Sequence, residues 1–177
     1  MIKHKKVLWI TRTAVLIAIT VVLQALTLPL GNQYKTGSIV NMMLILSVMT
    51  CGLSTGLTVS IVTPVLPTLL GFGPLWPIVP FIALANMVLV TCWHFIGNLR
   101  IPIDNAAYIL ALLAGAPAKF AVLYLGVVQI AAPLILGLPE GNIITVLFSF
   151  PQLITASAGG ACAIILLPAL KKAIKSK

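Results

Sequence analysis

Lys119 is the residue whose type and position most strongly predict binding chemistry. It lies in the apolar run 112–122, about thirteen residues after the expected cytoplasmic start of a membrane helix. At about 1.5 Å per residue, Lys119 is expected roughly 20 Å into a hydrocarbon core about 30 Å thick. An ammonium at that depth costs several kcal/mol unless it faces water, a partner group or the protein interior.

No carboxylate is expected close enough to neutralise Lys119. The chain has two acidic residues: Asp104 is expected at the cytoplasmic end of a helix, and Glu140 in an outer loop. A buried cation without an internal counter-ion favours an anionic ligand, so Lys119 is our leading candidate for an anion site. The alternative is that its long side chain extends to the outer membrane interface and binds nothing.

Four further residues are candidates for ligand contact. Asn86 interrupts the apolar run 80–88, and an amide in hydrocarbon needs partners, so it either binds a ligand or ties helices together. Gln152, beside Pro151, is a weaker candidate because a helix break there would leave it at the surface. Trp76 and Tyr34, in two expected outer loops, are candidate aromatic lids, although an interfacial aromatic belt is the commoner reason for either residue alone.

Motifs for catalysis are missing from the sequence. It contains no phosphate-binding loop of the Walker type, no HExxH metalloprotease motif, no Ser/His/Asp set and no pair of intramembrane carboxylates. The three cysteines have neither disulfide-framework nor metal-ligand spacing. We therefore predict a protein that binds rather than converts its ligand, is not an enzyme, and uses no metal or cofactor.

The composition is that of an integral membrane protein. Of 177 residues, 60% are hydrophobic and 7% are charged, and the mean hydropathy is +1.17, far from the balance of soluble domains. Apolar runs separated by turn-forming clusters predict a single all-α membrane domain over residues 1–177, with six transmembrane helices. These runs are 7–28, 38–50, a third run containing Pro64 and Pro67, 80–97, 105–138 and 142–173. The last two runs exceed one span, and 148–152 is the expected joint in the final run.

Basic residues predict the orientation of these helices. The chain carries eleven Lys or Arg residues and a net charge of +9, and with six spans most of them fall at the two termini and in the loop after the fourth helix. The positive-inside rule places that side in the cytoplasm. A multi-pass protein of the cell membrane, surrounded by lipid, is therefore expected rather than a nucleic-acid-binding protein, with the first and third loops outside.

The whole-chain pattern resembles the substrate-binding S component of an energy-coupling factor (ECF) vitamin transporter. The matching features are a short six-helix chain with both termini inside, Ala14-x-x-x-Ala18 in the first helix, a polar first loop ending in Thr36-Gly37, and a proline-rich third loop. The resemblance covers nearly all of the chain. Alanines at this spacing share a helix face and let another helix approach closely.

The resemblance implies that the chain captures a water-soluble vitamin from outside the cell. Ala14 and Ala18 would dock on a transmembrane T subunit, which is joined to two cytoplasmic ATPase subunits. The first and third loops would be lids over an outward-opening pocket among the fourth to sixth helices, where Asn86 and Lys119 are expected.

The choice of substrate combines the resemblance with Lys119. An unpaired buried lysine favours a carboxylate, and among the vitamins that the resemblance implies, pantothenate is small and anionic. A pyridoxine-like or hydroxymethylpyrimidine-like vitamin is the runner-up, because Lys119 could instead donate to a hydroxyl or ring oxygen. From a different class, a membrane structural or assembly protein would use the same polar residues only to tie its helices together.

Overall fold

Helices form almost the whole chain, as the apolar runs predict. The computed structural model describes residues 2–28, 33–103, 105–139 and 141–175, and these ranges contain no strand. In chain order the helices are α1 (Ile2–Thr27), α2 (Gln33–Cys51), α3 (Leu53–Leu69), the short 3-10 helix η2 (Trp76–Ile78), α4 (Val79–Ile96), α5 (Ala106–Leu123), the π-helix η3 (Tyr124–Ile135), α6 (Ile143–Leu147) and α7 (Phe150–Lys175). The predicted all-α class is confirmed.

Four helical segments of the described chain are long and apolar enough to cross a membrane. They are Lys6–Thr27, Trp76–Ile96, Ala106–Ile135 and Ile143–Ile174. α3 is apolar but shorter, with 17 residues, and α2 is not among the four. These lengths and compositions agree with the predicted membrane protein.

α2 is the central helix of the bundle. It packs against α1, α3, α4 and α7, and every residue from 43 to 49 is buried. A helix enclosed by other helices does not need an apolar surface facing lipid, so it can carry polar side chains that pair within the protein. Asn41 and Ser47 on α2 are buried in this way.

The predicted helix ends agree with the structure in some places and differ in others. The joint expected at 148–152 is confirmed, since α6 ends at Leu147 and α7 begins at Phe150. The long run 105–138 has no break, because α5 passes directly into η3. α2 begins at Gln33, five residues before the predicted start at 38. Of the polar residues there, Thr36 is buried in the bundle, and its hydroxyl donates to Thr27 Oγ1 at 2.9 Å.

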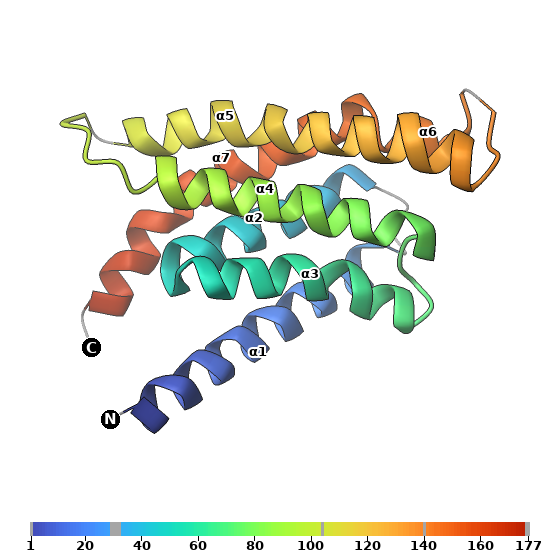
Figure 1. Cartoon of the computed structure of the whole chain (residues 1–177). Coiled ribbons are helices and arrows are strands. Elements are labelled where there is room, and N and C mark those ends of the chain that lie inside the picture. Colours follow the sequence, from blue (N-terminus) through green and yellow to red (C-terminus); the bar gives the residue numbers. More distant parts are fainter. Residues whose placement is uncertain (1, 29–32, 104, 140, 176–177) are drawn as a thin grey trace.

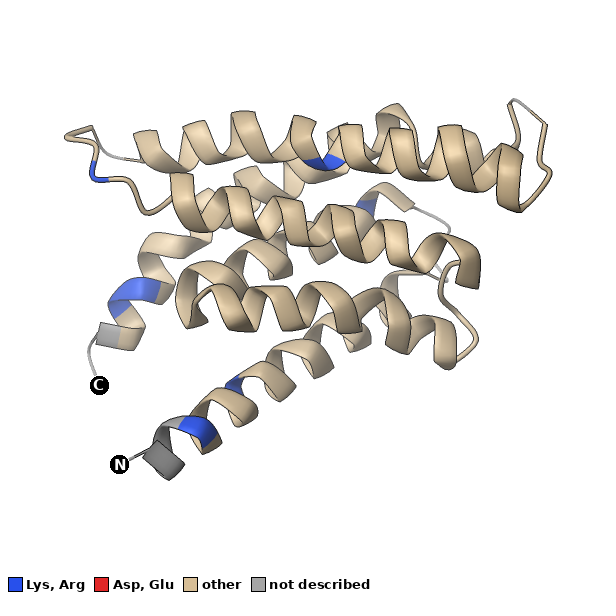
Figure 2. Cartoon of the chain, viewed as in Figure 1, with Lys and Arg blue, Asp and Glu red and all other residues tan. Residues whose placement is uncertain are grey.

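Both chain termini lie at the same end of the bundle (Figure 1). That end also holds the connection between α4 and α5, which carries Arg100, and the last turns of α7, which carry Lys171 and Lys172 (Figure 2). The opposite end is formed by the start of α2, the connection between α3 and η2, and α6. The bundle therefore has a strongly basic end. The opposite end contains the start of α2, with Tyr34, and η2, with Trp76, which are the two candidate lid residues.

Gly159 on α7 fixes how closely α2 approaches. A Cβ atom at Gly159 would lie 2.5 Å from the carbonyl oxygen of Ser38 and 2.7 Å from Cβ of Asn41, both on α2. We expect Gly159→Val to destabilise the fold by about 1–3 kcal/mol, the usual cost of overpacking, and to lower the melting temperature in detergent. Ala161→Val, at an exposed position of the same helix, is the matched control. Equal melting temperatures for the two variants would contradict this packing.

Candidate functional site

The Lys119 side chain turns into the bundle rather than toward the membrane interface. Lys119 is 4% exposed. Its Nζ donates to Oδ1 of Asn41 at 2.5 Å and to Oδ1 of Asn86 at 2.7 Å. α5 therefore holds the ammonium between two amide oxygens, one from α2 and one from α4.

Each asparagine is oriented by a second hydrogen bond on its amide nitrogen. Asn41 Nδ2 donates to Thr155 Oγ1 on α7, and Asn86 Nδ2 donates to the carbonyl oxygen of Ser60 on α3, both at 3.4 Å. With its nitrogen occupied, each amide directs its oxygen at Lys119. The network therefore joins five helices in a medium where an unpaired polar group is costly.

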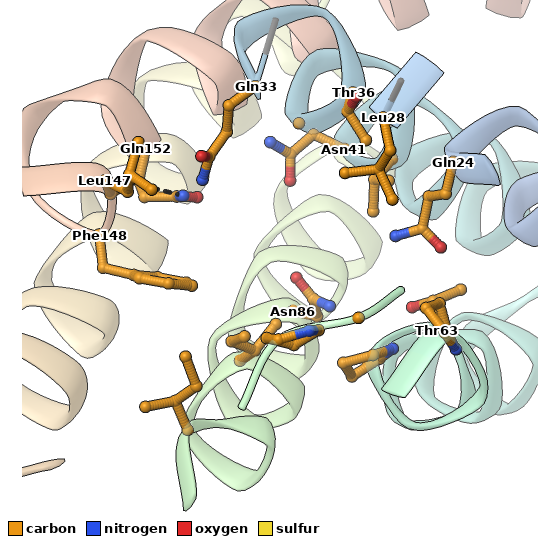
Figure 3. Close-up of a pocket in the computed structure, with 18 of the residues that line it drawn as sticks. Gln24, Leu28, Gln33, Thr36, Asn41, Thr63, Asn86, Leu147, Phe148 and Gln152 are labelled. Carbon is orange, nitrogen blue, oxygen red and sulfur yellow. Dashed lines mark hydrogen bonds between the residues drawn. The ribbon is translucent and has the colours of Figure 1, made fainter. Parts of the chain in front are cut away.

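A cavity of about 380 Å³ adjoins this network (Figure 3). It is formed by the end of α1, the start of α2, the second half of α3 with the connection to η2, α4, α5, α6 and the start of α7. Its volume lies at the lower end of the range typical of small-molecule sites. Its polar lining residues are Gln24, Gln33, Thr36, Asn41, Thr63, Asn86, Lys119 and Gln152. Phe72, Phe148, prolines and aliphatic side chains supply most of the remaining wall.

The electrostatics of the cavity favour an anion. A lysine ammonium has three donors, and Asn41 and Asn86 accept two of them, which leaves one for a ligand. Among the described residues no carboxylate lines the cavity; both acids of the chain, Asp104 and Glu140, lie outside the described residues. The two neutral amides solvate the ammonium but leave its charge uncompensated.

Further amides supply hydrogen bonds for the rest of a polar ligand. Figure 3 shows Gln33 and Gln152 on one side of this space and Gln24 on the other. Gln152 Nε2 donates to the carbonyl oxygen of Leu147 at 3.1 Å, which leaves its own oxygen as an acceptor. Gln24 Oε1 is buried and has no hydrogen-bond partner among the described residues. The site can thus hold a small molecule that combines an anionic group with neutral polar groups.

Three of the five predicted ligand-contact residues line this cavity: Lys119, Asn86 and Gln152. Tyr34 and Trp76 do not line it, and they are 49% and 53% exposed. Helix periodicity explains why Tyr34 does not line the cavity, because it lies off the face of α2 that does. The residues on that face are Gln33, Thr36, Gly37, Val40 and Asn41.

Ala14 and Ala18, the predicted docking residues, are both exposed on α1 and lie outside the cavity. α1 packs against α2 and α3 through other positions, including Thr13, whose hydroxyl lies 3.3 Å from Oγ1 of Thr55 on α3. The face that carries the two alanines is therefore open to another helix.

Asn41 is the most important site residue that the sequence analysis missed. It carries the same signal as Asn86, a single amide inside an apolar run. Gln24, Gln33 and Thr63 also line the cavity. They lie near helix ends or among other hydroxyl residues, where a polar side chain is ordinary and gives no signal.

Comparisons of the chain with protein families, curated proteins and solved structures found no match. Within the described ranges, no group of three or more His, Cys, Asp or Glu residues is placed to hold a metal ion. The interpretation of the site therefore rests on its own geometry.

The coupling between Lys119 and Asn86 is measurable by a double-substitution cycle. We expect Asn86→Leu to lower the free energy of unfolding by about 1.5–3 kcal/mol, the contribution typical of a hydrogen bond to a charged group. In a Lys119→Met background the same substitution should cost clearly less, because no buried ammonium then needs the oxygen. Unfolding in mixed micelles of increasing SDS content measures both. Strictly additive effects would contradict a direct interaction.

Proposed function

We propose that this chain is the substrate-capture subunit of an ATP-driven ECF vitamin importer. The observation that carries the proposal is a buried lysine, held by two neutral amides, at the wall of a cavity of small-molecule size. The cavity lies at the end of the bundle opposite the chain termini, among the ends of α1 and α2, the connection after α3, and α6. A subunit that captures a solute needs such a site on the side where the solute arrives.

The proposed orientation rests on the distribution of charge. Six helical segments would cross the cell membrane: α1, α2, α3, α4, α5 together with η3, and α7. Both termini would then be cytoplasmic. The basic end, with Arg100, Lys171 and Lys172, then obeys the positive-inside rule. The cavity opens to the outside in this orientation, and the residues around its mouth would act as lids.

The proposed substrate is pantothenate. Its carboxylate suits the remaining donor of Lys119, and its hydroxyl and amide groups suit the glutamine and threonine side chains of the cavity. The cavity volume of about 380 Å³ favours a small vitamin over folate or cobalamin. A pyridoxine-like or hydroxymethylpyrimidine-like vitamin is the second candidate, because the same amides can bind a neutral polar ring.

The proposed partners are a transmembrane T subunit and two ATPase subunits. The sequence has no nucleotide-binding motif of its own, so energy for uptake must come from a partner. The exposed alanines Ala14 and Ala18 on α1 give a smooth face against which a partner helix can pack closely.

Calorimetric titration of the purified protein with pantothenate, pyridoxine and hydroxymethylpyrimidine tests the substrate. We expect pantothenate to bind tightly, and Lys119→Met to weaken it about 10- to 100-fold, as loss of a charge-assisted hydrogen bond implies. Lys171→Met is the matched control. It removes a lysine that donates to Tyr108 at the opposite end of the bundle and should leave the affinity unchanged.

Two other outcomes of the titration would contradict part or all of the proposed function. Binding of a neutral vitamin that is insensitive to Lys119→Met would keep a vitamin-capture role and overturn the anion site. If none of the three vitamins bound while Lys119→Met lowered the melting temperature, the structural or assembly role would replace the proposed function.

Co-purification tests the partner surface. We expect Ala14→Leu combined with Ala18→Leu to abolish recovery of the T subunit and ATPases with the tagged chain, because larger side chains prevent close helix approach. Vitamin binding should be retained, since neither alanine lines the cavity. Ala114→Leu, at an exposed position on α5, is the control. Undiminished recovery of the partners with the double variant would contradict docking through this face.

A further inference from the structure

A second cleft lies between the π-helix η3 and the segment that contains α6. Its volume is about 490 Å³. From η3 it is lined by Tyr124, Val128, Gln129 and Pro133, and from the following chain by Leu138, Gly141, Thr145, Val146, Ser149, Phe150 and Pro151. None of these residues lines the cavity around Lys119. α6 separates the two spaces, with Ile144 and Leu147 facing the Lys119 cavity and Thr145 and Val146 facing the cleft.

The π-helical geometry of η3 creates the wall of this cleft. Hydrogen bonds in a π-helix join residues five apart, so such residues lie near one another on one face. Gln129 follows Tyr124 by five positions, and Pro133 follows Val128 by five. In an α-helix each pair would be rotated by about 140° around the axis. π-helical segments are rare, usually a single turn long, and frequent at functional sites, whereas η3 has 12 residues.

Polar groups in the cleft have unused hydrogen-bonding capacity. The Tyr124 hydroxyl and the Gln129 amide make no hydrogen bond to any described residue. Across the cleft, the Thr145 and Ser149 hydroxyls donate to the backbone carbonyls of Asn142 and Thr145, which leaves their oxygens as acceptors. The two unpartnered donors come from η3, inside the apolar segment Ala106–Ile135.

We propose that this cleft binds a membrane lipid through its glycerol-ester region. Apart from Leu138 and Gly141, the lining residues belong to the segments Ala106–Ile135 and Ile143–Ile174, which are long and apolar enough to cross a membrane. In the proposed orientation, the open side of the cleft would meet lipid. Ester oxygens would accept hydrogen bonds from Tyr124 and Gln129, whose polar groups are costly to leave unpaired near hydrocarbon. An acyl chain would lie along Val146 and Phe150, which are 51% and 62% exposed.

The described lining of the cleft consists of hydroxyl, amide and apolar groups. The proposed contacts are therefore to ester oxygens and an acyl chain, which phospholipids with different headgroups share.

Photo-crosslinking in nanodiscs tests the proposal. The full chain is reconstituted with a small fraction of phosphatidylcholine that carries a photoreactive acyl chain, and the labelled peptides are identified by mass spectrometry. We expect labelling concentrated on 124–150, with phosphatidylglycerol of the same acyl composition giving equal labelling. Tyr124→Phe combined with Gln129→Leu should reduce it about fivefold to tenfold. Leu134→Ala, which changes a residue of η3 that is 77% exposed and does not line the cleft, is the control.

Several results would overturn the proposal. Uniform labelling of all lipid-facing helices, unchanged labelling in the double variant, or a strong preference for the anionic lipid would each do so. If the double variant does not fold, Val146→Trp provides a second test, because an indole from this partly exposed position would fill the cleft and exclude the lipid. Unchanged labelling of Val146→Trp would likewise reject the site.

Discussion

The structure depends on burying the ammonium of Lys119 in a bundle that offers few acceptors. A charged group can be kept in such a place only if neighbouring helices bring polar atoms to it. Asn41 and Asn86 supply those atoms, and Thr155 and Ser60 hold the two amides in the required orientation. One hydrogen-bond network, centred on the Lys119 side chain, therefore joins α2, α3, α4, α5 and α7.

Enclosure by other helices sets α2 apart from its neighbours. It presents Asn41 to the interior, and α1, α3, α4 and α7 pack around it. Gly159 on α7 permits this enclosure, because its missing side chain lets the backbone of α2 come close. The polar centre and the tight packing of α2 against α7 thus depend on each other.

The two hollow spaces of the molecule differ in the chemistry of their walls. The cavity around Lys119 is rich in amides and carries a positive charge, which suits a polar anion. The cleft beside η3 is uncharged among its described residues and is partly bounded by exposed apolar side chains, which suits a lipid. α6, only five residues long, separates them, so a small rearrangement of this segment would affect both.

The sequence determined the all-α class and the joint near residue 148. It also singled out Lys119 and Asn86 as polar residues inside the bundle, because a polar residue in an apolar run is a local signal. Only the tertiary structure decided that Asn41, 78 residues from Lys119 along the chain, would hold its ammonium, that Tyr34 and Trp76 would lie off the cavity, and that η3 would be a π-helix. Apolar side chains pack equally well against lipid and against other helices, so the sequence of a membrane helix does not record which face turns inward. That choice is made by the packing of the helices around the buried charge.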